Sequence, residues 1–218
     1  MRILAFAASL RKASLNRKLI ALAVEIARRE GADVDLAEFR EFEMPVYDGD
    51  LDAAQGLPPG ALALKRRVAG ADALLIAAPE YNYSMSGALK NAIDWVSRAR
   101  PMPWRGKSAY LLSASPSPMG GVRGLWQTRI PLEGCGALVF PDMFALPHAN
   151  EAFAADGQLR DAGQAERLEK EIVGFVRLAE AVAPVCTGRG GAIVHDPQRQ
   201  KKIAVALEAE TEIQPPSR

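Results

Sequence analysis

The chain has 218 residues, 49% of them hydrophobic, so it can bury one substantial core and we expect a single main domain. Its 27 basic and 26 acidic residues leave a formal charge of +1, which gives no strong overall field for nucleic acid or an anionic membrane. The two cysteines lie outside any CxxC or Cys/His cluster, which argues against a disulfide framework, a zinc site or an iron–sulfur site. These observations predict a cytoplasmic protein that acts on small molecules.

The N-terminal segment has the pattern of a strand, a helix and a second strand. Residues 2–8 form a short, near-continuous apolar run, typical of a strand that is covered on both faces of a parallel sheet. This run is too short to span a membrane, and Arg11 follows it, the wrong order for a secretory signal. Apolar residues recur at helical spacing over 16–29, Gly31 ends that helix, and residues 34–39 are the predicted second strand.

The middle of the chain alternates between loops, helices and buried strands. Residues 40–60 concentrate turn signals and are expected to form an ordered surface loop rather than an interdomain linker. Helical spacing returns over 61–69, and residues 71–78 are a buried strand that Pro79 ends. The elements predicted after it are a helix over 87–98, a strand over 107–114, a helix that Pro131 interrupts or ends, a strand near 137–140 and a helix over 163–183.

Five strands that alternate with helices predict a doubly wound parallel sheet with right-handed crossovers. Two topologies of this kind fit the pattern, and both place ligands at the carboxyl ends of the strands, where the winding reverses. The loops after residues 8, 78 and 114 are therefore the expected functional positions. Residues 184–218 differ in composition and allow a short helix over about 197–209, so we expect a domain over 1–183 followed by a C-terminal extension.

The first of these loops, SLRKASLN over residues 9–16, leads directly into a helix. Unpaired N–H groups and the helix dipole favour an anion at such a position, and serine hydroxyls and Arg11 strengthen the preference. A phosphate monoester fits, because this loop lacks the glycines of GxGxxG that admit a diphosphate, and the chain has no GxxxxGK[ST] motif. The alternative is that Ser14 or Asn16 simply caps the helix and that Arg11 and Lys12 form a solvated turn.

The second and third loops carry groups suited to a flat, hydrogen-bonding ring. The second, PEYNYS over residues 79–84, supplies aromatic surface and backbone donors and acceptors. The third, SPSPMGG over residues 115–121, has small residues that let a backbone approach the edge of a ring. Taken alone, Tyr81 and Tyr83 are equally consistent with ordinary exposed aromatics, but beside the other two loops they favour ring binding.

With all three loops in order, the sequence closely resembles the NAD(P)H-dependent FMN reductase family of flavodoxin-like proteins, which includes enzymes described as chromate, quinone and azo-dye reductases. The motifs that carry the resemblance are SLRxxSxN, PEYNxS followed by GxLKNAIDW, and SxSP followed by GG, within residues 1–183. The resemblance implies an α/β three-layer sandwich whose five-stranded parallel sheet has the order 2-1-3-4-5. It also implies bound FMN, NADPH or NADH as co-substrate, and assembly as a homodimer or homotetramer, with no nucleic acid or membrane partner.

Site residues are carried over only where this sequence matches the family motifs. Those implied for the FMN phosphate are Ser9, Arg11, Ser14, Leu15 and Asn16. Those implied for the isoalloxazine ring are Pro79, Glu80, Tyr81, Asn82, Tyr83 and Ser84, with Ser115, Gly120 and Gly121 closing its other side. Flavin N5 carries the chemistry, so no side chain is expected to be catalytic and no metal is expected. The residues expected to be structural are Lys90, Asn91, Asp94 and Trp95.

Several residues fit this scheme less directly. Ala8 and Ser86 stand where many relatives have glycine and proline. Glu80 invites the role of a general base, but transfer to a flavin needs orientation more than proton abstraction, so we expect it to shape the loop or contact the ring. Arg98 and Arg100 either meet a nucleotide phosphate or are solvated. We expect no catalytic or metal role for His148 and His195, and only a core or interface role for Trp104 and Trp126.

The expected reaction moves a hydride from NAD(P)H through FMN to quinones, azo compounds, chromate-like oxyanions or free flavin, with ping-pong kinetics. An electron-carrier flavodoxin without NAD(P)H turnover is the alternative. Such carriers are usually markedly acidic, which a charge of +1 and an arginine in the phosphate loop do not match. A flavin-free binding protein on the same scaffold stays open, because a fold does not fix a function.

Overall fold

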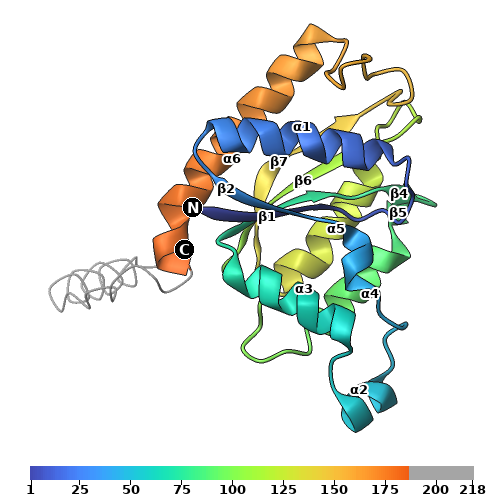
Figure 1. The fold of residues 1–218 in the computed structure, drawn as a ribbon, viewed down its shortest axis with the longest axis vertical. Helices are drawn as coiled ribbons and strands as arrows, with labels where there is room; N and C mark the ends of the chain where they lie inside the picture. Colours follow the sequence, from blue (N-terminus) through green and yellow to red (C-terminus); the bar gives the residue numbers. More distant parts are fainter. Residues whose placement is uncertain (187–218) are drawn as a thin grey trace, which may run out of the picture.

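The computed structural model describes residues 1–186, which form a twisted, five-stranded parallel sheet (Figure 1). The order across the sheet is β2-β1-β3-β6-β7, and the main strands taken in chain order therefore give 2-1-3-4-5, which confirms the flavodoxin-like topology. The strands are β1 (Arg2–Ala7), β2 (Asp33–Ala37), β3 (Ala73–Ala77), β6 (Ser108–Ala114) and β7 (Leu138–Leu146). Residues 187–218, with the short helix expected near 197–209, lie outside the described residues.

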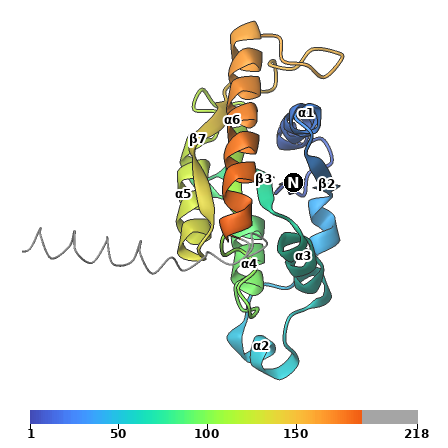
Figure 2. The ribbon, with the colours of Figure 1, turned by 90° about the vertical axis from the view of Figure 1, so that its left-hand side faces the viewer.

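Helices cover both faces of the sheet and complete a three-layer sandwich (Figures 1 and 2). One face carries α1 (Leu15–Arg29) and α6 (Ala162–Cys186). The other face carries α3 (Pro59–Gly70), α4 (Gly87–Val96) and α5 (Val122–Gly134). Pro131 lies inside α5 without ending it, so this helix runs three residues beyond the position where the sequence predicted a break.

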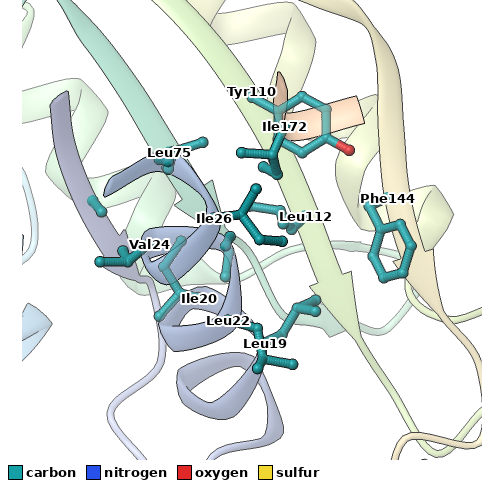
Figure 3. Close-up of a cluster of buried hydrophobic side chains, with 14 of the residues drawn as sticks. Leu19, Ile20, Leu22, Val24, Ile26, Leu75, Tyr110, Leu112, Phe144 and Ile172 are labelled. Carbon is teal, nitrogen blue, oxygen red and sulfur yellow. The ribbon is translucent and has the colours of Figure 1, made fainter. Parts of the chain in front are cut away.

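The core has two halves because successive strand residues point to opposite faces of the sheet. Ile3, Leu75 and Leu112 pack toward α1 and α6, where Figure 3 shows Leu75 and Leu112 near side chains of those helices. Leu4 and Leu74 pack toward the other three helices. Both sets are fully buried, which explains why the strands read as continuous apolar runs rather than as alternating patterns.

Three short elements lie where the sequence predicted loop or strand. Phe39 begins a 3-10 helix, η1 (Phe39–Phe42), rather than ending β2, because Glu38 and Glu41 form a capping box at this point. Asp48 accepts hydrogen bonds from two backbone N–H groups and starts α2 (Gly49–Gln55) inside the turn-rich loop. The loop after β3 contains a small antiparallel hairpin of β4 (Glu80–Tyr81) and β5 (Ser84–Met85).

The loop that carries α2 is anchored at both ends. The Pro45 carbonyl accepts hydrogen bonds from Trp95 Nε1 and Asn91 Nδ2, each at 2.8 Å, and Asn91 Oδ1 accepts from the backbone N–H of Tyr47 at 2.8 Å. At the other end, Gly60 lies so close to Glu43 that a Cβ on it would be 2.0 Å from the Glu43 carbonyl oxygen. Helix α2 projects from the body in both views and buries none of its own residues within the described structure (Figures 1 and 2).

None of the helices within residues 1–186 is both long enough and apolar enough to cross a bilayer.

Candidate functional site

The loops after β1, β3 and β6 meet at the carboxyl edge of the sheet and line one cavity of about 80 Å³. Its lining residues are Ser9, Arg11, Ser14, Leu15, Asn16, Pro79, Glu80, Tyr81, Ala114, Ser115 and Pro116. Ala114 and Pro116 were not among the expected site residues, although they flank Ser115, which was. The other expected residues, which do not line the cavity, belong to the hairpin and to the start of α5, and they are Asn82, Tyr83, Ser84, Gly120 and Gly121.

The first loop presents hydrogen-bond donors to this cavity. Ser9 and Ser14 are buried, and the Ser14 side chain makes no capping bond to α1 within the described structure. The first N–H groups of a helix have no partner inside the helix, so those at the start of α1 are also available. Arg11 is exposed, and its guanidinium has no hydrogen bond or ion pair among residues 1–186. Hydroxyls, helix N–H groups and a free guanidinium together make an anion site.

Asn16 lines the cavity, and its side chain is bonded within the chain. Its Nδ2 donates to the Ala114 carbonyl and its Oδ1 accepts from the Ala114 N–H, each at 3.0 Å. Both ends of the amide are therefore used to join the start of α1 to the end of β6. Any contact from Asn16 to a phosphate must come from its backbone N–H, and the side chain instead fixes the first loop against the third.

The hairpin β4–β5 turns through two residues in the left-handed region, Asn82 at φ 48° and Tyr83 at φ 65°. Tight two-residue hairpins need this conformation at both positions, and asparagine adopts it more readily than tyrosine does. Tyr83 is also 71% exposed, so burial does not hold it there. The backbone at Tyr83 is therefore held in an unfavourable conformation, as is frequent at ligand sites.

Glu80 is not a free base. One of its oxygens lies 2.6 Å from Arg123 Nη2, and the other accepts the backbone N–H of Gly124 at 3.2 Å. Its side chain is only 8% exposed, so the pair is largely removed from water. A carboxylate in this state shapes the loop, and its charge is balanced by Arg123 before any anion enters the cavity.

The glycine pair of the third loop places helix α5. Gly121 has φ 91°, and a Cβ on it would lie 2.1 Å from Ser113 Oγ at the end of β6. Ser115, at the beginning of this loop, donates its N–H to the Leu146 carbonyl at 3.1 Å and accepts the Ser117 N–H on its hydroxyl at 3.2 Å. The loop is thus held by its own hydrogen bonds and by close packing, with Gly120 also in the left-handed region at φ 61°.

The two departures from the family motifs contact each other. Ser86 is the N-cap of α4, and its hydroxyl accepts the Leu89 N–H at 3.2 Å. The same hydroxyl donates to the Ala8 carbonyl at 3.3 Å. Ser86 therefore starts the helix and ties the second loop to the first, which a proline side chain could not do.

Arg123 and Gly124 are functional candidates that the sequence reasoning missed. Arg123 stands in the first turn of α5, where the helix dipole disfavours a positive charge. A cation at this position is a signal that an anionic partner lies nearby, and Glu80 is that partner. The separation of these two residues along the chain hid the pair from any local pattern.

Other candidates have partners away from the cavity. The Arg98 guanidinium lies over the Tyr47 ring, 5.5 Å from its centroid, and Arg100 donates to backbone carbonyls, so neither side chain faces the three loops. Trp104 is buried, whereas Trp126 is half exposed. No group of three His, Cys, Asp or Glu side chains suited to a metal occurs in the described part of the chain.

Tyr110 and Cys135 have raised pKa values, and neither side chain lines the cavity. Burial, reinforced by a hydrogen bond to Glu171, raises the pKa of Tyr110 far above its usual value. Burial also raises the pKa of the Cys135 thiol. Both shifts favour the neutral form, so these groups belong to the packing of the protein.

The strand order defines a flavodoxin-like protein, and the loop cavity lies at the switch point of the sheet, where such folds bind their ligands. The family model for NADPH-dependent FMN reductases matches residues 1–151. A Pseudomonas aeruginosa NAD(P)H-dependent FMN reductase is 35% identical over 179 residues, covering 79% of this chain and 91% of that protein. A quinone reductase of Escherichia coli is 30% identical over 185 residues, covering 84% and 97%.

Among solved structures, the NAD(P)H:(acceptor) oxidoreductase FerB of Paracoccus denitrificans aligns with a TM-score of 0.71 at 31% identity, covering 83% of this chain and 98% of that one. The chain belongs to the NADPH-dependent FMN reductase family. This membership confirms the expected oxidoreductase class and the expected use of FMN and a reduced nicotinamide nucleotide.

Proposed function

We propose that the chain is an FMN-containing reductase that takes electrons from NAD(P)H and passes them to small oxidised acceptors, with quinones as the leading class. One observation carries the proposal: three strand-end loops bring buried serine hydroxyls, a helix N-terminus and a free arginine to one cavity. Relatives named as quinone reductases and FMN reductases support quinones and free flavin as acceptors. Azo compounds and chromate-like oxyanions are further candidates, to be compared in the same assay.

The residues present fit the phosphate end of FMN. The cavity of about 80 Å³ is well below the roughly 300 Å³ at which a pocket encloses a whole drug-sized ligand, so it suits one end of a cofactor. Ser9, Arg11 and Ser14, with the N–H groups of Leu15 and Asn16, would hold the phosphate. The residues proposed to line the ring are Pro79, Glu80, Tyr81, Asn82, Tyr83, Ser84, Ser115, Gly120 and Gly121.

In this mechanism the chain binds and orients rather than acting as acid or base. When bound, FMN would supply the redox chemistry, which no side chain of this site provides. Arg11 balances the phosphate charge, and the buried serines desolvate and fix that end. Arg123 balances Glu80, which would otherwise repel an anion in the same cavity. Exposed Tyr81 and Tyr83 offer apolar surface beside it.

An anaerobic reduction experiment separates this function from that of an electron carrier. Protein loaded with FMN is mixed with NADPH, and separately with NADH, while the visible flavin bands are followed. Rapid bleaching is expected, because a reductase accepts the hydride directly, and the ratio of the two rates gives the nucleotide preference. Protein that stays yellow with both nucleotides, or that retains no FMN after desalting, contradicts the proposal.

We also propose a ping-pong sequence in which the oxidised nucleotide leaves before the acceptor binds. The sequence shows one mononucleotide site and no second nucleotide motif, so the two substrates are expected to use the same face in turn. Initial rates with NADPH and a quinone varied together should give parallel double-reciprocal lines. Intersecting lines would show that both substrates bind at once.

A homodimer or homotetramer is part of the same proposal. The cavity of one chain matches only the phosphate end of the cofactor, so a second copy is needed to shield the ring from water. Trp126 and Ile130, one turn apart on α5, are 51% and 63% exposed and offer apolar surface for such a contact. Sedimentation at micromolar concentration tests it, and a monomer would contradict it. We further propose a cytoplasmic location and a reductase domain over residues 1–183.

A further inference from the structure

Arg123 connects helix α5 to both ends of the hairpin β4–β5. Its Nη2 lies 2.6 Å from an oxygen of Glu80, the first residue of β4. Its guanidinium carbon lies 4.1 Å from the centroid of the Tyr83 ring, at the tip of the turn. One side chain therefore contacts the hairpin at its foot through an ion pair and at its tip through cation–π stacking.

The hairpin needs outside support to keep its shape. Its strands are two residues each, and an isolated hairpin of that length is not stable in water. Tyr83 also has φ 65°, a left-handed conformation that is unfavourable for a residue with a Cβ. Because Tyr83 is mostly exposed, the guanidinium under its ring is the contact best placed to offset that cost.

Close packing shows that the hairpin rests directly on α5. A Cβ on Gly124 would lie 3.0 Å from Glu80 Cα and 3.2 Å from the Ser84 carbonyl oxygen, so any larger residue here would push the hairpin backbone away by a few tenths of an ångström. The Gly124 N–H also donates to Glu80 at 3.2 Å. Arg123 stands in this same first turn, where the helix dipole opposes its charge, so its position serves the hairpin rather than the helix.

We propose that Arg123 is the positioning residue of the ring-binding loop: by pairing with Glu80 and stacking on Tyr83, it holds the hairpin in its left-handed turn before FMN binds. The inference rests on the proposed function only in naming FMN as the ligand. The conformational order of the hairpin without ligand can be measured whether or not FMN binds. Arg123 pairs with Glu80, which lines the phosphate cavity, but Arg123 does not line the cavity itself and therefore acts through the hairpin.

The test uses Arg123→Met, which removes the charge and the planar group, and the double variant Glu80→Gln with Arg123→Met, which also removes the unpaired buried carboxylate. Arg129→Met is the matched control, because Arg129 lies on the same helix and pairs with Glu133 at 2.8 Å, away from the hairpin. Two quantities are measured: hydrogen exchange of the amides of residues 80–85 without FMN, and the FMN dissociation constant from flavin fluorescence.

In Arg123→Met, exchange in the hairpin should speed up and the FMN dissociation constant should rise about two- to fivefold, as expected for losing a stacking contact to a largely exposed ring. The double variant should keep most of that loss, because Tyr83 still lacks its partner. Arg123→Lys, which keeps the charge without the planar group, should recover only part of the affinity. Arg129→Met should change neither quantity.

Two results would overturn the proposal. One is unchanged hairpin exchange in free Arg123→Met, which would show that the turn holds without Arg123. The other is full recovery of FMN affinity in the double variant, which would reduce Arg123 to a neutraliser of Glu80. Failure of the wild-type chain to bind FMN would instead remove the proposed function, and the exchange data would still decide the role of Arg123.

Discussion

The loop of residues 9–16 and the hairpin of residues 80–85 border the same cavity, but they are built in opposite ways. The first loop leaves its donors unused, with the Arg11 guanidinium unpaired and the Ser14 hydroxyl making no capping bond within residues 1–186. The hairpin has its charge paired and its exposed ring stacked before any ligand arrives.

This difference indicates that the first loop serves ligand binding, whereas the hairpin depends on contacts within the chain to keep its shape. A loop with unused donors gains its partner from the ligand, so its substitutions should alter affinity while leaving the free protein stable. A segment held by packing and ion pairing should lose stability or order when that support is removed. The following variants test the distinction.

The largest effect is expected from Gly121→Ala, where the third loop packs closely against the end of β6. The added Cβ meets Ser113 Oγ and must adopt φ 91°, so the free energy of unfolding should fall by about 3 kcal/mol, from backbone strain and overpacking together. Gly31→Ala is the control, because Gly31 has φ 87° with nothing within 4 Å of its Cβ in the described structure, and should lose about 1 kcal/mol. Urea unfolding of both variants measures the difference, and equal losses would show that the packing is not tight.

On the open side, Arg11→Ala should weaken FMN binding by about 1.5 to 3 kcal/mol, the loss of a charge-assisted hydrogen bond. Its unfolding midpoint without FMN should stay at the wild-type value, because Arg11 has no partner among residues 1–186. Arg29→Ala serves as the control, since Arg29 pairs with Glu169 at the far end of α1. Calorimetric titration with FMN gives the affinity, and an unchanged dissociation constant would remove Arg11 from the site.

Asn16→Ala should lower the stability of the free protein, although Asn16 belongs to the first loop. The substitution leaves the buried N–H and carbonyl of Ala114 unpaired, and the free energy of unfolding should drop by about 2 kcal/mol. Asn150→Ala should have little effect, because the exposed Asn150 amide bonds only to Glu151 among residues 1–186. A stable Asn16→Ala that merely binds FMN less well would show that the Asn16 side chain contacts the phosphate instead of joining the two loops.

The smallest effect concerns the tie between the two loops. Ser86→Ala removes the N-cap of α4 and the bond to Ala8, and should cost about 1 kcal/mol of stability. Ser86→Thr keeps the hydroxyl and should lie close to wild type in thermal unfolding. If alanine and threonine behave alike, the cap makes no net contribution.

The sequence was sufficient for the sheet and the three loops because their signals are local. Buried parallel strands such as residues 73–77 read as unbroken apolar runs, and each ligand loop follows one of them directly. Helix α2 and η1 were missed because single capping residues, Asp48 and Glu38, start them inside a turn-rich segment.

Contacts between distant parts of the chain account for the rest. Asn16 bonds to a residue 98 positions away, so its pattern was indistinguishable from that of a phosphate ligand. Arg123 and Glu80 are paired only by the fold, and the left-handed turn at Tyr83 has no sequence signal of its own. These long-range contacts hold the three loops in place, whereas the local sequence patterns only indicated which loops form the candidate site.

The double hydrogen bond to the Pro45 carbonyl has a practical consequence. Together with the close approach of Gly60 to Glu43, it brings the ends of the 44–59 segment together against the body. Helix α2 at its far end has no fully buried residue in the described structure, and Leu51 is its only residue that packs, partly buried, against the core there. The tip of this segment should therefore tolerate the attachment of a fluorophore or an affinity peptide. The FMN affinity of the labelled protein would measure any effect on the site.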